Sequence, residues 1–89
     1  MEVVIDCAEF SSSEELYQAL MVRLSLPSCY GMNLDALWDS ITGLVAMPLA
    51  IIWIGFETSV STIGDYAYKV EELFREAEKE VPGFRFEKM

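Results

Sequence analysis

Histidine is absent from this 89-residue chain, and basic residues are few: six Lys and Arg stand against fifteen Asp and Glu, for a net charge of −9. Without histidine, the Ser-His-Asp and Cys-His nucleophile schemes and the usual zinc sites lack a required residue, which argues against an enzyme of those classes. The six cationic residues are scattered, whereas binding to nucleic acid requires clustered positive charge. The composition therefore predicts a protein that binds no nucleic acid directly and whose partner is basic.

Cysteines and long apolar runs are also scarce. Cys7 and Cys29 form no C-x-x-C pair, and two cysteines are too few for a disulfide scaffold, so a reducing compartment is expected. The most apolar run, residues 43–56, is interrupted by proline and glycine and is shorter than the ~20 residues that cross a bilayer. The N-terminus has no basic region or cleavage site of a secretory signal. We therefore expect a cytoplasmic protein with no membrane segment.

Apolar residues make up 53% of the chain, enough for the core of one domain over residues 1–89. Their spacing predicts these elements: strands at residues 2–6, 49–54 and 84–87, and helices at residues 13–25, 34–43 and 65–81. Residues 55–64 lack a firm period and are expected to be irregular or helical, with room for at least one short helical turn. Because helices separate the strands, we predict an α/β fold: a small three-stranded parallel sheet packed against three to four helices.

Several local features refine this prediction. Ser12 and Glu15 have the spacing of a capping box at the start of the first helix, and Asn33 is expected to cap the second. The first strand has the pattern of a buried strand and the last that of a half-buried edge strand. The strand at residues 49–54 is apolar on both alternating faces, so it is either covered on both sides or walled by helices and neighbouring strands.

The second helix has two chemically distinct sides. Its apolar side holds Leu34, Leu37, Trp38, Ile41 and Val45. A separate stripe holds Asp35, Asp39 and Thr42. Asp35 complements the helix dipole in the first turn, but Asp39 lies in mid-helix, where aspartate has poor propensity. The pair therefore either serves a binding role or merely solubilises the helix, and the pattern alone favours neither.

The last long helix carries a second acidic series, Glu72, Glu76 and Glu80, opposite its apolar side. A solvated face is the more common explanation for such a run. If this series lies beside the aspartate stripe of the second helix, the two form one acidic concavity.

The segment before the second helix contains Cys29, Tyr30 and Gly31. It is either a helix connector or a shaped contact loop, in which Gly31 permits a positive φ and Tyr30 is a rigid contact residue. Cys29 has no cationic neighbour in sequence to lower its pKa, which favours a surface contact over a reactive thiol. Cys7 is expected to be a small core residue.

The stretch YGMNLDALWDSITG, residues 30–43, closely resembles the binding loop and second helix of the barstar family, intracellular inhibitors of the ribonuclease barnase. The likeness extends to LPSCYG before this stretch, to PLAIIWIGF after it and to VEELFREAEKE in the last helix, so it covers nearly the whole chain. The resemblance implies a barstar-like fold in which the second helix and the preceding loop block a ribonuclease active site.

By position, the resemblance also implies roles for individual residues. Asp39 is the central anchor, its carboxylate standing in for a substrate phosphate, and Asp35 is the second acidic contact. The full set of implied partner-binding residues is Asp39, Asp35, Cys29, Tyr30, Gly31, Asn33, Leu34, Trp38, Thr42, Gly43, Leu44 and Glu76, with Glu80 a weaker candidate. The resemblance implies no catalytic residue, metal site or cofactor.

Three positions depart from the family pattern. Cys29 and Leu44 stand where the family has aromatic residues, and Ala46 stands where it has an acid. The acidic centre is retained while its rim has changed, which suits a ribonuclease other than barnase that is bound in the same general mode.

Three hypotheses follow. The first is a 1:1 inhibitor of a basic extracellular ribonuclease, or, as a close variant, the immunity protein of a ribonuclease toxin. The alternative is an interaction module that keeps this scaffold but binds a partner other than a ribonuclease. The third is an enzyme or metal protein that uses Asp35 and Asp39, for which the sequence offers no further ligand set or nucleophile.

Overall fold

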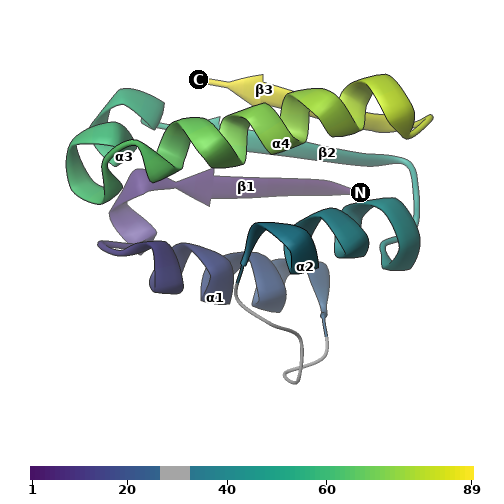
Figure 1. The fold of residues 1–89 in the computed structure, drawn as a ribbon, viewed down its shortest axis with the longest axis horizontal. Helices are drawn as coiled ribbons and strands as arrows, with labels where there is room; N and C mark the ends of the chain where they lie inside the picture. Colours follow the sequence, from purple (N-terminus) through teal and green to yellow (C-terminus); the bar gives the residue numbers. More distant parts are fainter. Residues whose placement is uncertain (27–32) are drawn as a thin grey trace.

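Three parallel strands form the sheet of this protein. A computed structural model describes residues 1–26 and 33–89. The strands are β1 (Glu2–Asp6), β2 (Leu49–Ile54) and β3 (Phe84–Lys88), in the spatial order β1-β2-β3 (Figure 1). This arrangement confirms the predicted three-stranded parallel sheet, with β2 at its centre and β3 at one edge.

The core lies on one face of the sheet. In the pairing register Val3, Ile51 and Phe86 stand side by side, and all three are buried. On the opposite face the equivalent row contains half-buried Val4 and Ile52 and exposed residues of β3. Of the two expectations for β2, coverage on both faces is therefore wrong. The strand is walled by its neighbours, and the helices pack on the face that bears the core. β1 is likewise an edge strand, buried on one face only.

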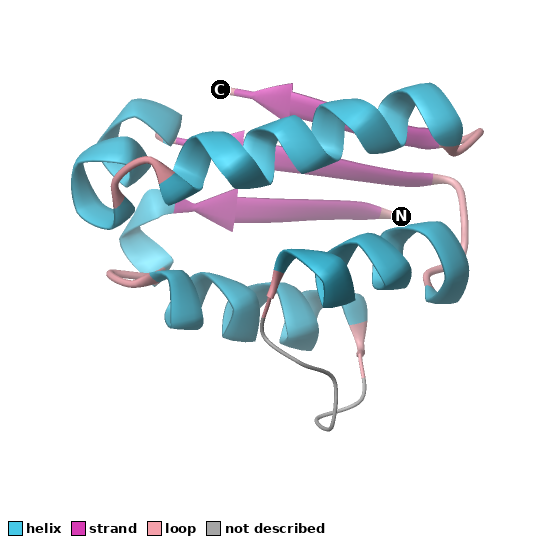
Figure 2. Ribbon diagram, viewed as in Figure 1, coloured by secondary structure: helices cyan, strands magenta, loops and turns pink. Residues whose placement is uncertain are grey.

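The described residues form five helical segments beside the sheet, and a π-helical turn extends one of them (Figure 2). They are η1 (Cys7–Glu9), α1 (Ser13–Leu24), α2 (Leu34–Asp39) with its π-helical extension η2 (Ser40–Leu44), α3 (Phe56–Ile63) and α4 (Tyr66–Glu80). The three predicted long helices are confirmed to within one or two residues at each end. In the described residues no helix has the combination of length and apolar character needed to span a bilayer.

Of the two alternatives for residues 55–64, the helical one is confirmed, although α3 has eight residues and is longer than one short turn. Phe56 and Ser59 are fully or almost fully buried, and Val60 and Ile63 pack against the core. These positions have helical spacing, but serine and threonine between them weaken the apolar period. The helix starts after Gly55, whose φ of 73° suits glycine, and a Cβ there would collide with the Cys7 side chain.

The predicted capping box of α1 is only half formed. The Ser12 hydroxyl accepts a hydrogen bond from the Glu15 N–H at 3.1 Å, as expected. The Glu15 carboxylate instead accepts bonds from the Ser11 N–H and hydroxyl at 2.8 and 2.6 Å, which lower the pKa of Glu15. A complete capping box is present one element earlier, between Asp6 and Glu9 of η1. The S-x-x-E spacing therefore predicted the start of α1 correctly, but not the hydrogen-bond partner of the Glu15 carboxylate.

Trp53, in the middle of the core, is the largest fully buried side chain. Its indole N–H donates to the Ser59 hydroxyl at 2.9 Å, and that hydroxyl donates to the Gly55 carbonyl at 3.2 Å. Phe56 and Phe10 meet the indole edge-on, with ring centres 5.0 and 6.2 Å away. Ser59 therefore satisfies the one polar atom of the tryptophan side chain and ties α3 to β2.

We expect Ser59→Ala to lower the free energy of unfolding by about 1–3 kcal/mol, because the buried indole N–H loses its acceptor. Ser61→Ala is the matched control: Ser61 lies on the same helix but is exposed, and this change should stay within about 0.5 kcal/mol. Denaturant unfolding followed by tryptophan fluorescence measures both. Equal effects of the two substitutions would contradict this account.

Two tyrosines join α1 to α4. The Tyr17 and Tyr66 hydroxyls are 2.5 Å apart, and their rings meet edge-on with centres 6.0 Å apart. Burial, and secondarily the hydrogen bond with Tyr66, raises the pKa of Tyr17 above its ordinary value of 10.0. Folding therefore favours the protonated form of Tyr17.

This raised pKa predicts a loss of stability at alkaline pH. The stability that Tyr17 adds through its raised pKa is fully present below the unfolded-state pKa near 10. It is lost as the pH rises through that value toward the higher folded-state pKa. Above about pH 10 the free energy of unfolding should fall more steeply in the parent protein than in Tyr17→Phe, by up to ~1.4 kcal/mol per pH unit. Tyr68→Phe, at a residue that is 47% exposed, should keep the parent slope. Urea unfolding at a series of pH values gives the slopes, and identical slopes for parent and Tyr17→Phe would refute the prediction.

Candidate partner-binding face

Helix α2 is held between α1 and α4. Leu37 is buried and Ser40, the first residue of η2, is fully buried, and both face the α1 residues Tyr17 and Leu20. The buried Ser40 hydroxyl is satisfied within its own helix, because it donates to the Ala36 carbonyl at 2.8 Å. On the other side α2 packs beside α4 (Figure 2). Contacts on two sides fix the rotation of α2 about its own axis.

The acidic stripe faces solvent. Asp35, Asp39 and Thr42 are all exposed, as the helical spacing predicts. Neither aspartate carboxylate has a hydrogen bond or ion pair with any described residue. Asn33 caps the helix as expected, its side-chain oxygen accepting the Ala36 N–H at 2.8 Å. Two free carboxylates therefore project from a helix whose own position is fixed.

The π-helical turn η2 continues this face. The Val45 N–H donates to the Ser40 carbonyl at 2.9 Å, which closes the wide turn, so the helical segment ends one residue beyond the predicted Gly43. Gly43 is exposed, and a Cβ there would meet nothing within 4 Å. Leu44, at the end of the turn, is 56% exposed. The fold itself thus does not require glycine at position 43.

A groove runs between α2 and α4. It has a volume of about 460 Å³, and its lining residues are Leu34, Trp38, Lys69, Glu72, Leu73, Glu76 and Glu80. The two leucines and the tryptophan are half-buried, whereas the charged residues are exposed. Lys79 pairs with Glu76 at 3.4 Å on the exposed side of α4. The acidic series of α4 therefore lies beside the apolar side of α2, across the floor of the groove. Asp35 and Asp39 do not line this groove, so a single acidic concavity that includes them stays a prediction.

Not every expected site residue can be placed. Cys29, Tyr30 and Gly31 lie outside the described residues. Lys69 and Leu73 also line the groove, although the sequence did not predict them at the site. They lie there because α4 packs beside α2. Leu73 belonged to the apolar period of its helix and gave no separate signal.

Charge is distributed unevenly around this face. Between Arg23 and Lys69 the sequence contains no lysine or arginine, so α2 and η2 carry no cation. Most basic side chains of α4 and β3 are engaged in ion pairs away from the stripe, Arg75 with Glu71 and Lys88 also with Glu71. Within residues 1–26 and 33–89, no group of three or more carboxylates or thiols is placed to hold a metal ion. The aspartate stripe is thus an uncompensated acidic surface.

Comparison with known proteins agrees with this geometry. Residues 1–88 match the family model described as Barstar (barnase inhibitor). The chain is also 41% identical over 80 residues to a Bacillus subtilis (strain 168) protein named "Putative ribonuclease inhibitor YrdF", a match that covers 90% of this chain and 88% of that protein. Together with the three-stranded parallel sheet and its helices, these matches show that the chain belongs to the barstar family.

Proposed function

We propose that this protein inhibits a basic ribonuclease, of extracellular or toxin type, by inserting the acidic face of α2 and η2 into its active site in a 1:1 complex. One observation carries the proposal: Asp35 and Asp39 are exposed and pair with no described residue, on a helix that is itself held between two others. Membership of the barstar family supports the class of partner. Protection of the producing cell, including immunity to a ribonuclease toxin, is the biological role that suits such a complex.

Asp39 is the anchor in this proposal. A ribonuclease binds the RNA phosphate with cationic side chains, and an unpaired carboxylate satisfies the same donors. Because α1 and α4 already fix α2, little conformational entropy is lost when the carboxylates dock. Asp35 lies one turn before Asp39 and provides the second acidic contact.

The neighbouring polar groups can both accept hydrogen bonds from a partner and donate them to it. The Thr42 hydroxyl already donates its proton to the Trp38 carbonyl at 2.8 Å. Its oxygen is therefore left to accept a bond from a lysine, arginine or backbone N–H of the ribonuclease. The Asn33 side-chain oxygen is engaged in capping, and its amide N–H groups, which bond to no described residue, can donate to an acceptor on the ribonuclease.

The groove between α2 and α4 suits a basic side chain at the margin of the interface. Its floor of Leu34, Trp38 and Leu73 can pack against an aliphatic stem, and Glu76 can pair with the charged head. The exposed pair between Lys79 and Glu76 is of a kind worth only ~0–1 kcal/mol, so a partner displaces it at little cost. Exposed Leu44 adds an apolar contact at the other end of the face.

We expect Asp39→Ala to weaken binding by at least about 2 kcal/mol, roughly 30-fold. This is a general figure for buried charged anchors, of which the barnase and barstar pair is itself a standard example. The matched control is Asp65→Ala, which removes the same charge from an exposed residue at the start of α4 that makes no capping bond. That change should leave the affinity nearly unaltered.

The measurement is inhibition of RNA cleavage by barnase and by other basic ribonucleases, titrated with the parent protein and with both variants. Inhibition at one inhibitor per enzyme that is lost in Asp39→Ala alone supports the proposal. If no basic ribonuclease is inhibited, or if Asp39→Ala inhibits as well as the parent protein, the proposal fails and a partner other than a ribonuclease is favoured.

Gly43 provides a second test, in which stability and binding should respond differently. Because a Cβ at this position meets nothing in the chain, Gly43→Ala should leave stability unchanged or raise it by up to about 1 kcal/mol. In the proposed complex the added methyl group would stand in the interface and hold the two proteins apart, so we expect binding at least about tenfold weaker. Thermal unfolding and the same titration measure the two effects, and unaltered affinity would remove Gly43 from the interface.

A further inference from the structure

The outer edge of β3 is the free margin of the sheet. The Gly83 carbonyl accepts the Leu49 N–H at 3.0 Å, and the Met89 N–H donates to the Trp53 carbonyl at 2.8 Å. In a parallel ladder alternate residues bond to the same neighbour, so residues 84, 86 and 88 direct their backbone groups away from β2. In Figure 1, β3 forms the outer margin of the sheet, and α4 crosses its face. Such an edge is a template for pairing with another strand.

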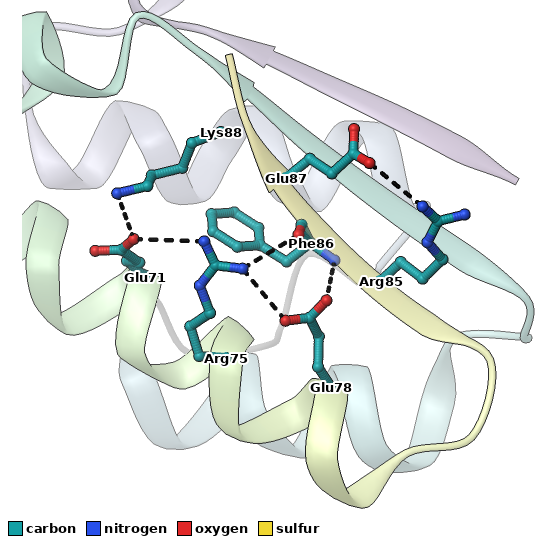
Figure 3. Close-up of polar contacts among 7 residues, drawn as sticks. All are labelled: Glu71, Arg75, Glu78, Arg85, Phe86, Glu87 and Lys88. Atoms are coloured by element: carbon teal, nitrogen blue, oxygen red, sulfur yellow. Dashed lines mark hydrogen bonds and ion pairs between the residues drawn. The ribbon is translucent and has the colours of Figure 1, made fainter.

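Two side chains of α4 occupy the centre of this edge (Figure 3). Glu78 accepts the Phe86 N–H at 2.9 Å, and Arg75 donates to the Phe86 carbonyl at 3.4 Å. Arg75 and Glu78 are themselves paired at 3.4 Å, and the guanidinium lies 4.8 Å from the centre of the Phe86 ring. The Phe84 N–H is bonded to the Val81 carbonyl at 3.1 Å. Both backbone groups that would join a new strand at Phe86 are thus already in use.

The opposite edge of the sheet, formed by β1, is covered by a similar arginine–glutamate pair. Arg23 of α1 donates to the Val4 carbonyl of β1 and pairs with Glu9, while Glu9 accepts the Asp6 N–H at 3.3 Å. An arginine and a glutamate, paired with each other, thus cover a carbonyl and an N–H on each edge strand. A helix also contacts each edge strand, α1 on the β1 side and α4 on the β3 side.

The β3 strand is complementary to a second copy of itself. If two β3 strands pair antiparallel about a two-fold axis at Phe86, Arg85 of each copy stands opposite Glu87 of the other. Opposite charges directly across a strand pair are stabilising. Both residues are exposed, and within one chain they form a pair at 3.3 Å. The partner that fits this edge best is therefore another molecule of the same protein.

We propose that Arg75 and Glu78 form an edge guard that keeps this protein monomeric, and that without the guard two copies join through β3, antiparallel about Phe86. The guard acts by occupying the Phe86 N–H and carbonyl, which would otherwise exchange bonds with Phe86 of the second copy. This inference is independent of the ribonuclease, because it concerns a surface on the side of α4 that faces β3.

The test is the double variant Arg75→Ala/Glu78→Ala, which leaves the net charge unchanged. At about 0.15 M salt, where exposed charges are screened beyond ~8 Å, its mass should rise toward twice the 10.1 kDa of one chain with increasing concentration. The matched control is Glu76→Ala/Lys79→Ala, which removes an exposed pair of the same spacing from the same helix. The control and the parent protein should stay monomeric in sedimentation equilibrium. A guardless variant that is folded and monomeric at millimolar concentration overturns the proposal.

Two further variants keep the test decisive. Adding Glu87→Arg to the guardless protein places arginines opposite each other across the pair and should restore the monomer. The single change Glu78→Ala retains the ion pair of Arg75 with Glu71 and is the milder variant if the double one unfolds. In Glu78→Ala, hydrogen exchange of the Phe86 amide should be faster than in the parent protein at low concentration and slow again at high concentration. Protection at Val4 or Asp6 instead of Phe86 would assign the contact to β1 and refute the proposal.

Discussion

The one-sided core is the constraint on which the rest of the molecule depends. Val3, Ile51 and Phe86 point to the same face of a three-stranded sheet, and Trp53 lies on that face with its indole N–H satisfied by Ser59. All of the long helices must bury their apolar stripes against this single surface. With α1 and α4 in place, α2 has only the space between them, and its polar side is left to face solvent. The position of the aspartates is therefore a consequence of core packing.

Much of this could be predicted from the sequence, because the signals are local. Periodic leucines in the helices, the β-branched strands and the Asn33 cap each depend on neighbours a few residues away. The exposed stripe of Asp35 and Asp39 follows from helical geometry alone. Resemblance to the barstar family supplied the roles of these residues, which the pattern left undecided.

The remaining features depend on contacts between distant segments or on weak local signals. The sequence leaves helix α3 undecided between helix and irregular structure because serine and threonine separate Phe56 from its partners, and part of its stability comes from contact with Trp53. The helices cover β2 on one face of the sheet. The apolar pattern of the strand itself does not indicate on which faces helices will pack. The groove beside α2 and the bonds from Arg75 and Glu78 to β3 both require knowing which elements are adjacent. Burial patterns identify the core, but they do not identify which surfaces meet.

The absence of lysine and arginine between Arg23 and Lys69 makes the distribution of charge over the molecule uneven. All six cations lie on α1, α4 and β3, while α2 and η2 carry only carboxylates. The aspartate face therefore carries negative charge that no cation of α2 or η2 offsets. A cationic surface attracts this face over about a Debye length, before the two molecules make contact. A diffusing molecule then spends less of each encounter searching over rotations.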